Sequence, residues 1–122
     1  MGTEIKGATI SPRYENNILY WYYKDTFELD WKFNIKQDGT EYTIQPEDKI
    51  TINFYMGCRL VHSFVFENIV DNTIKVMFTP EISNKFIPGE YSYCVKFNQY
   101  IDGAYSNTTI GANYTAIVEV CH

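Results

Sequence analysis

The chain has 122 residues, of which 45% are hydrophobic and 17% aromatic, and it carries a formal net charge of −5. This length suits one domain with a hydrophobic core of its own. The acidic charge disfavours contact with phosphate backbones, so no nucleic-acid partner is expected. The first residues lack the apolar segment of a signal peptide, and no apolar run approaches the roughly 18 residues of a membrane span, so neither secretion by a signal peptide nor membrane insertion is expected.

The N-terminal third predicts an arm followed by strands. Residues 1–16 mix Gly, Ser, Pro, Asn and charged residues, and we expect an arm or a short edge strand ahead of a single domain over residues 17–122. The run Ile18–Tyr23 is continuously apolar and aromatic, which indicates a strand covered on both faces. Thr26–Lys36 alternates apolar and polar residues throughout, which predicts one long strand with a single face on the core.

The middle of the chain predicts hairpins. Asp38 and Gly39 form an Asp-Gly pair, a strong signal for a tight hairpin turn, and Tyr42–Ile44 continues as a short strand. Lys49–Met56 alternates cleanly and predicts the next strand. Leu60–Glu67 alternates as well, with His62 on its inward face.

A strand and one helical turn follow. Thr73–Thr79 alternates with its apolar residues inward, and Thr79 is a favourable cap for a helical turn near residues 80–86. Pro80 suits the first helical position because its missing N–H is not needed there.

Residues 87–97 read Ile-Pro-Gly-Glu-Tyr-Ser-Tyr-Cys-Val-Lys-Phe, a tight turn that leads into a strictly alternating strand. We expect Gly89 to serve the turn, and Tyr91 and Tyr93 to form part of the core wall. Cys94 then lies on the opposite face, out of register for the disulfide that pins many immunoglobulin domains. The three widely spaced cysteines are therefore predicted to be reduced thiols.

The chain is predicted to end with a hairpin over Asn98–Gly103 and two further strands, Ala104–Ile110 and Asn113–Cys121. Several short strands with turns about every 8–12 residues are typical of all-β sandwiches and barrels. The pattern predicts an all-β antiparallel β-sandwich of seven to nine strands with one short helical turn near residues 80–86, and the family resemblance given below implies that this sandwich is immunoglobulin-like.

The sequence carries no recognisable arrangement for chemistry. It has two histidines, His62 within a strand and His122 at the end of the chain, and no nucleophile motif beside either. Most of the 15 Asp and Glu residues occupy outward strand positions or turns. We therefore expect no enzymatic activity, no catalytic residue, no metal and no other cofactor.

The chain contains 11 tyrosines, and they cannot all belong to the core. Exposed tyrosines anchor protein interfaces or stack on sugar rings. They also cover sheet faces and the bases of loops, and the sequence leaves these alternatives open. The candidates for an interface are Tyr20, Tyr22, Tyr23, Tyr100 and Tyr105.

Three stretches occur in an order that is informative together. Asp25-Thr26 opens an alternating strand, Thr79-Pro80-Glu81 closes another, and residues 87–93 form a Pro-Gly-x-Tyr-x-Tyr turn and strand. This order resembles the immunoglobulin-like N-terminal domain of phage baseplate upper proteins and similar prophage tail proteins of Gram-positive bacteria. Lys24 stands where that family has a Gly. The likeness extends over residues 17–121.

The resemblance implies a non-enzymatic structural or assembly domain of a phage or prophage tail or baseplate. Such a domain is virion-associated, is made in the bacterial cytoplasm, and has other tail subunits or copies of itself as partners. The alternative left open is a bacterial surface or secreted β-sandwich for carbohydrate binding or adhesion, which the surplus tyrosines and the acidic charge favour.

Overall fold

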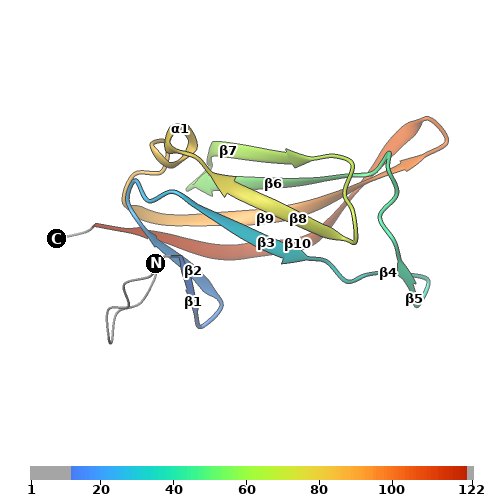
Figure 1. Cartoon of the computed structure of the whole chain (residues 1–122), viewed down its shortest axis with the longest axis horizontal. Helices are drawn as coiled ribbons and strands as arrows, with labels where there is room; N and C mark the ends of the chain where they lie inside the picture. The colour runs from blue at the N-terminus through green and yellow to red at the C-terminus, as the bar shows by residue number, and fades with distance from the viewer. Residues whose placement is uncertain (1–11, 121–122) are drawn as a thin grey trace, which may run out of the picture.

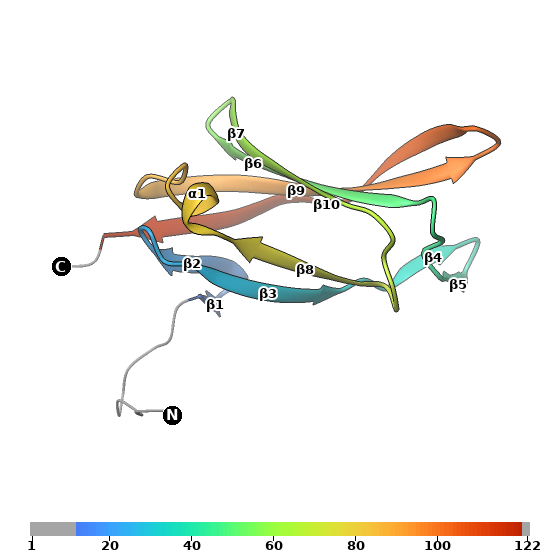
Figure 2. The same ribbon diagram turned by 45° about the horizontal axis from the view of Figure 1, so that its top comes forward.

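The computed structural model describes residues 12–120, which form an all-β sandwich with one short helix (Figure 1). The predicted fold class is thereby confirmed. The larger layer is a six-stranded sheet, and a two-stranded sheet faces it (Figure 2). In order across the larger sheet, the strands are β1 (Arg13–Glu15), β2 (Ile18–Tyr22), β10 (Ala104–Glu119), β9 (Gly89–Ile101), β6 (Lys49–Met56) and β7 (Arg59–Phe66).

The facing layer is small. It consists of β3 (Phe27–Lys32) paired antiparallel with β8 (Thr73–Phe78). A separate hairpin joins β4 (Ile35–Gln37) to β5 (Thr40–Tyr42). Helix α1 (Pro80–Ser83) follows β8 at one end of the sandwich. Ten strands are thus described where seven to nine were predicted, and three of them have only three residues.

One pairing departs from the predicted antiparallel arrangement. β2 runs parallel to β10, with Ile18 opposite Thr115 and Tyr22 opposite Glu119. Local alternation does not report this pairing, because it joins segments from opposite ends of the chain. β1, which pairs antiparallel with β2, forms an edge strand within the segment expected to be an arm or edge strand.

Several predicted strands differ from the observed strands in their limits or their burial. The predicted strand over Thr26–Lys36 ends at Lys32. The Phe33 N–H still bonds to the Asn72 carbonyl (2.8 Å) in the register of β3 and β8, and the chain then leaves β8 for the β4–β5 hairpin. In β2 only Leu19 and Trp21 are fully buried, so one face rather than both is covered.

The last two predicted strands are one continuous strand, β10, with register shifts between Thr109 and Tyr114. β9 also continues past the predicted limit at Phe97. It reaches Ile101, and the hairpin turn lies at Asp102 and Gly103 as expected.

Aromatic rings fill the core between the two sheets. Trp21 is fully buried and contacts Phe27, Phe54, Phe78 and Phe86, with ring centroids 5.0–6.4 Å apart. These tilted and edge-on contacts add about 0.5–1.5 kcal/mol per pair to the burial of apolar area. The core therefore joins β2, β3, β6, β8 and the segment after α1.

The turn before β9 is held by specific contacts. The Tyr91 hydroxyl donates to the carbonyl of Ile87 (2.6 Å), four residues earlier, as in the tyrosine corner of immunoglobulin-like sandwiches. Gly89 has φ +149°, and a Cβ there would lie 2.9 Å from the Met56 Cε. Thr79 caps α1, as predicted, by accepting from the Ile82 N–H (3.3 Å).

Within residues 12–120, no helix has the length and apolar character needed to cross a membrane.

Candidate groove along the free edge of β3

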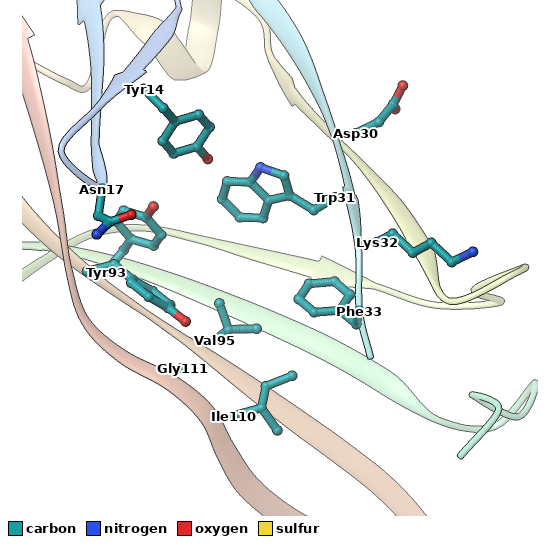
Figure 3. Close-up of a pocket in the computed structure, with 11 residues that line it drawn as sticks. Tyr14, Asn17, Asp30, Trp31, Lys32, Phe33, Tyr93, Val95, Ile110 and Gly111 are labelled. Atoms are coloured by element: carbon teal, nitrogen blue, oxygen red, sulfur yellow. The ribbon is translucent and has the colours of Figure 1, made fainter. Parts of the chain in front are cut away.

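A groove of about 560 Å³ opens between the two sheets beside β3 (Figure 3). The groove is lined by the last three residues of β3 and by Phe33, which follows them, together with residues of β9, β10 and the β1–β2 hairpin. Because side chains of a strand alternate between its faces, a lining that includes consecutive residues places the groove along the edge of β3. Its volume lies within the range of about 300–1,000 Å³ that is usual for ligand sites.

The edge of β3 beside the groove has unpaired backbone groups. Within residues 12–120, β3 pairs only with β8. The Phe33 N–H bonds to the carbonyl of Asn72, which continues the same register, so the odd-numbered residues form the hydrogen-bonded pairs with β8. The N–H and C=O groups of Glu28, Asp30 and Lys32 therefore point away from β8, toward the free edge.

Aromatic side chains form the walls and base of the groove. The rings of Trp31 and Tyr93 are stacked, with centroids 6.0 Å apart and planes 14° apart. The Tyr114 ring also packs against the Tyr93 ring, with their centroids 5.2 Å apart. Figure 3 shows Tyr14 approaching Trp31 from the β1–β2 hairpin. Tyr93 is buried, whereas Tyr14 and Tyr114 are 51% and 42% exposed and are accessible to a ligand.

The hydroxyls of Tyr14 and Tyr93 remain protonated at neutral pH. Burial, and next the nearby hydroxyl of Tyr14, raise the pKa of Tyr93 well above its ordinary value. Burial also raises the pKa of Tyr14, against the smaller effect of hydrogen bonds from Trp31 and Tyr93. Neutral phenols both donate and accept hydrogen bonds. The groove therefore combines flat apolar surfaces with polar tips.

An irregular stretch of β10 aims Tyr114 into the groove. The register of β10 against β9 shifts on both sides of Gly111, and Asn113 adopts a positive φ of 59°. A Cβ at Gly111 would overlap the Tyr114 ring, so the absence of a side chain at this position leaves the ring its place in the groove. Bulges of this kind redirect side chains next to functional sites.

Charged and polar groups stand at the rim. Asp30 and Lys32 are exposed, and Figure 3 shows them directed away from the aromatic walls. Asn17, in the turn between β1 and β2, lines the groove from the other side. Within the described part of the chain, no group of three or more His, Cys, Asp or Glu residues is placed to hold a metal ion.

The residues predicted for structural roles all belong to β9. Tyr91 and Tyr93 are buried on the inner face of β9, and Gly89 begins that strand. Cys94 is half-buried on the opposite face and is a free thiol, as is Cys58. Cys121 and His122 lie outside the described residues.

The five tyrosines predicted as interface candidates do not gather in one place. Tyr20 and Tyr22 lie on the outer face of β2, and the Arg13 guanidinium stands 4.6 Å above the Tyr20 ring. Tyr23 packs against the core. Tyr100 and Tyr105 form a cross-strand pair near the tip of the β9–β10 hairpin. Their ring centroids are 5.3 Å apart, and each residue is 43% exposed.

Sequence reasoning missed the groove itself. Trp31 was assigned correctly to the inner face of its strand, but Tyr14 fell within the expected arm and Tyr114 within a regular strand. The interruption of alternation around Gly111 and Asn113 was the available signal, since Gly and Asn inside a strand mark bulges.

No protein-family model, no curated protein and no solved structure matches this chain.

Proposed function

We propose that this chain is a non-enzymatic docking module of a phage or prophage tail or baseplate, and that it binds an extended segment of another subunit along β3. The observation that carries this function is the row of unpaired backbone groups on Glu28, Asp30 and Lys32 beside an aromatic groove. The sequence resemblance to baseplate upper proteins supports the phage setting.

The expected mode of binding is the addition of a strand. A segment laid along β3 would exchange main-chain hydrogen bonds with its free edge and direct alternate side chains into the groove. Main-chain bonds contribute about 0.5–1.5 kcal/mol each, and apolar side chains gain about 25 cal/mol per Å² that they bury against Trp31, Tyr93 and Val95. The backbone bonds set affinity, and the groove selects the side chains.

The test uses the whole chain mixed with purified tail and baseplate subunits that are encoded beside its gene. Light scattering should show a complex with at least one of them. A chain that stays alone with every subunit would contradict the proposed function.

A matched pair of variants tests the edge itself. Asp30→Pro removes an N–H that points to the free edge and leaves the bonds to β8 intact. Asp30→Ala retains that N–H and removes only the exposed carboxylate. We expect binding to weaken at least tenfold in the proline variant and to stay within twofold of the wild type in the alanine variant. Equal loss in both would indicate that the side chain, not the edge, is recognised.

A second candidate function, carbohydrate binding, is favoured by the chemistry of the groove walls. Sugar rings stack on aromatic faces and bond to hydroxyl groups, and the groove presents Trp31 with three tyrosines. A glycan array separates the two functions. A glycan whose binding is lost in Trp31→Ala but retained in Asp30→Pro would favour the carbohydrate function, and an array without binding would remove it.

A further inference from the structure

The edge strand β7 is long and unusually free of charge. Within residues 12–120 it pairs only with β6, and it forms the upper rim of the molecule in Figure 1. Its eight residues begin with Arg59, and no Lys, Arg, Asp or Glu follows until Glu67, just beyond its end. Leu60 and Val65 are 51% and 57% exposed. A long apolar edge of this kind is a template for pairing with another strand.

The opposite edge of the same sheet is protected in the usual ways. β1 has only three residues, and two of them are charged. Arg13 forms ion pairs with Glu15 (3.2 Å) and with Glu119 (2.8 Å) at that edge. Short length and charged side chains both discourage edge-to-edge pairing. The contrast singles out β7 as the edge of this sheet that is built to accept a neighbour.

We propose that β7 pairs antiparallel with β7 of a second copy of this chain, about a two-fold axis at Ser63, so that the two large sheets become continuous. A two-fold axis requires a surface that complements itself. The side chains of β7 meet this requirement in two respects, the placement of the exposed apolar residues and the charges at the ends of the strand.

The exposed apolar residues of β7 face one another in this arrangement. Val65 lies opposite Thr51, and Leu60 lies opposite Tyr55, so both point to the outer face of the sheet. The register shift leaves Val61 as an extra residue between them, a bulge in which two residues oppose one. Rotation about Ser63 places Val61 of one copy opposite Val65 of the other, twice, and the exposed Leu60 lies next to each of these pairs.

The charges at the ends of β7 favour the same orientation. Arg59 stands at its start, and Glu67, held by Lys49 at 3.2 Å, follows its end. Antiparallel pairing brings Arg59 of each copy near Glu67 of the other. Parallel pairing would set like charges side by side, which is unfavourable.

The contact uses a different edge of the molecule from the groove. β6 and β9 separate β7 from β10 in the sheet, so β3 and its groove stay open in the dimer. An interface built on one strand pair falls at the small end of the range, below about 1,200 Å², so the dimer is expected to be weak. Self-association and the proposed function therefore succeed or fail separately.

Sedimentation velocity across a hundredfold range of concentration tests the dimer, with two matched valine variants. Val65→Lys places a charge on the pairing edge, and Val70→Lys places the same charge at a residue 77% exposed in the loop after β7. We expect the wild type and the Val70 variant to form the same concentration-dependent dimer. In the Val65 variant, the dissociation constant of the dimer should be at least tenfold higher. A wild type that stays monomeric, or two variants that behave alike, would overturn the proposal.

A disulfide test locates the axis. Ser63→Cys puts two thiols directly opposite each other, where Cα atoms of paired strands lie about 4.5–5.5 Å apart and a disulfide forms. Mild oxidation should yield a covalent dimer, and mass spectrometry should find the bond between the two introduced thiols. A covalent dimer linked only through native cysteines would place the contact elsewhere.

Discussion

Removal of the buried carboxylate of Asp48 is expected to destabilise the sandwich more than loss of any exposed charge. Asp48 is 1% exposed, and its two oxygens accept three hydrogen bonds. One oxygen accepts from the Tyr42 hydroxyl (2.6 Å) and the Gln45 N–H (2.8 Å), and the other from the Tyr100 N–H (2.8 Å). The side chain thus ties the turn before β6 to β5 and to the outer part of β9.

The magnitude follows from what Asp48→Ala leaves behind. A hydrogen bond to a charged group contributes about 1.5–3 kcal/mol, and a buried donor left without a partner costs about 1–3 kcal/mol. The half-buried Tyr42 hydroxyl recovers water as a partner, so the three losses do not add in full. We expect the free energy of unfolding to fall by about 3–5 kcal/mol in the alanine variant, and by about 2 kcal/mol in Asp48→Asn, which keeps one acceptor oxygen.

Urea unfolding measures this change through the transition midpoint at constant slope. Asp30→Ala, which removes an exposed carboxylate from β3, serves as the control and should change stability by less than about 0.5 kcal/mol. Hydrogen exchange at the Tyr100 amide gives a local readout, and it should accelerate in both Asp48 variants. Stability within about 1 kcal/mol of the wild type in Asp48→Ala would refute the role of this carboxylate as a buried acceptor.

Three further changes have defined outcomes. Tyr91→Phe should lower the free energy of unfolding by about 1–2 kcal/mol, since it removes the hydroxyl bond to the carbonyl four residues earlier; urea unfolding measures it. Gly111→Ala should displace the Tyr114 ring and alter its NMR contacts with the groove, because the new methyl group overlaps that ring. The pKa of His62, measured by NMR titration, should lie below its ordinary 6.5, mainly because the ring is partly buried and secondly because the positive charge of Lys85 is close to it. Lys85→Gln should therefore reverse only the smaller part of this decrease in pKa.

The histidine also sets a direction for the dependence of stability on pH. Because the folded state lowers the pKa of His62, the unfolded chain binds the proton more readily. Stability should therefore decline as pH falls through 6.5 and level off below the folded pKa, and His62→Gln should remove this part of the decline. A decline in His62→Gln as large as in the wild type, an unchanged Tyr114 ring in Gly111→Ala, or a Tyr91→Phe chain as stable as the wild type would each contradict the corresponding prediction.

The fold was predictable where local pattern and turn chemistry agree. β6, β8 and β9 alternate at period two, and their buried residues are those that the alternation assigned to the core. The Asp-Gly turns at Asp38 and Asp102 adopt the positive φ values that such hairpins need. Thr79 caps α1 for the same local reason, because its side chain reaches the backbone three residues ahead.

The candidate groove was not predictable in the same way. Trp31 reads in the sequence as one more inward residue of an alternating strand, and Tyr93 as core wall. They line a groove only because β8 covers one edge of β3 while the β1–β2 hairpin and the bulged part of β10 approach the other. Pairs far apart in sequence decide this arrangement.

The sequence by itself therefore determined which side chains of β6, β8 and β9 face the core, where the two Asp-Gly turns lie and where the helical turn begins, because these depend on contacts within a few residues. Only the tertiary structure decided that β2 joins β10 in parallel, that β3 keeps an open edge above an aromatic groove, and that β7 ends the large sheet without protection. The physical reason is that alternation specifies the face of a strand but not its neighbour. The neighbour is chosen by the packing of the whole core, and that choice leaves the unpaired edges of β3 and β7 on which both proposals rest.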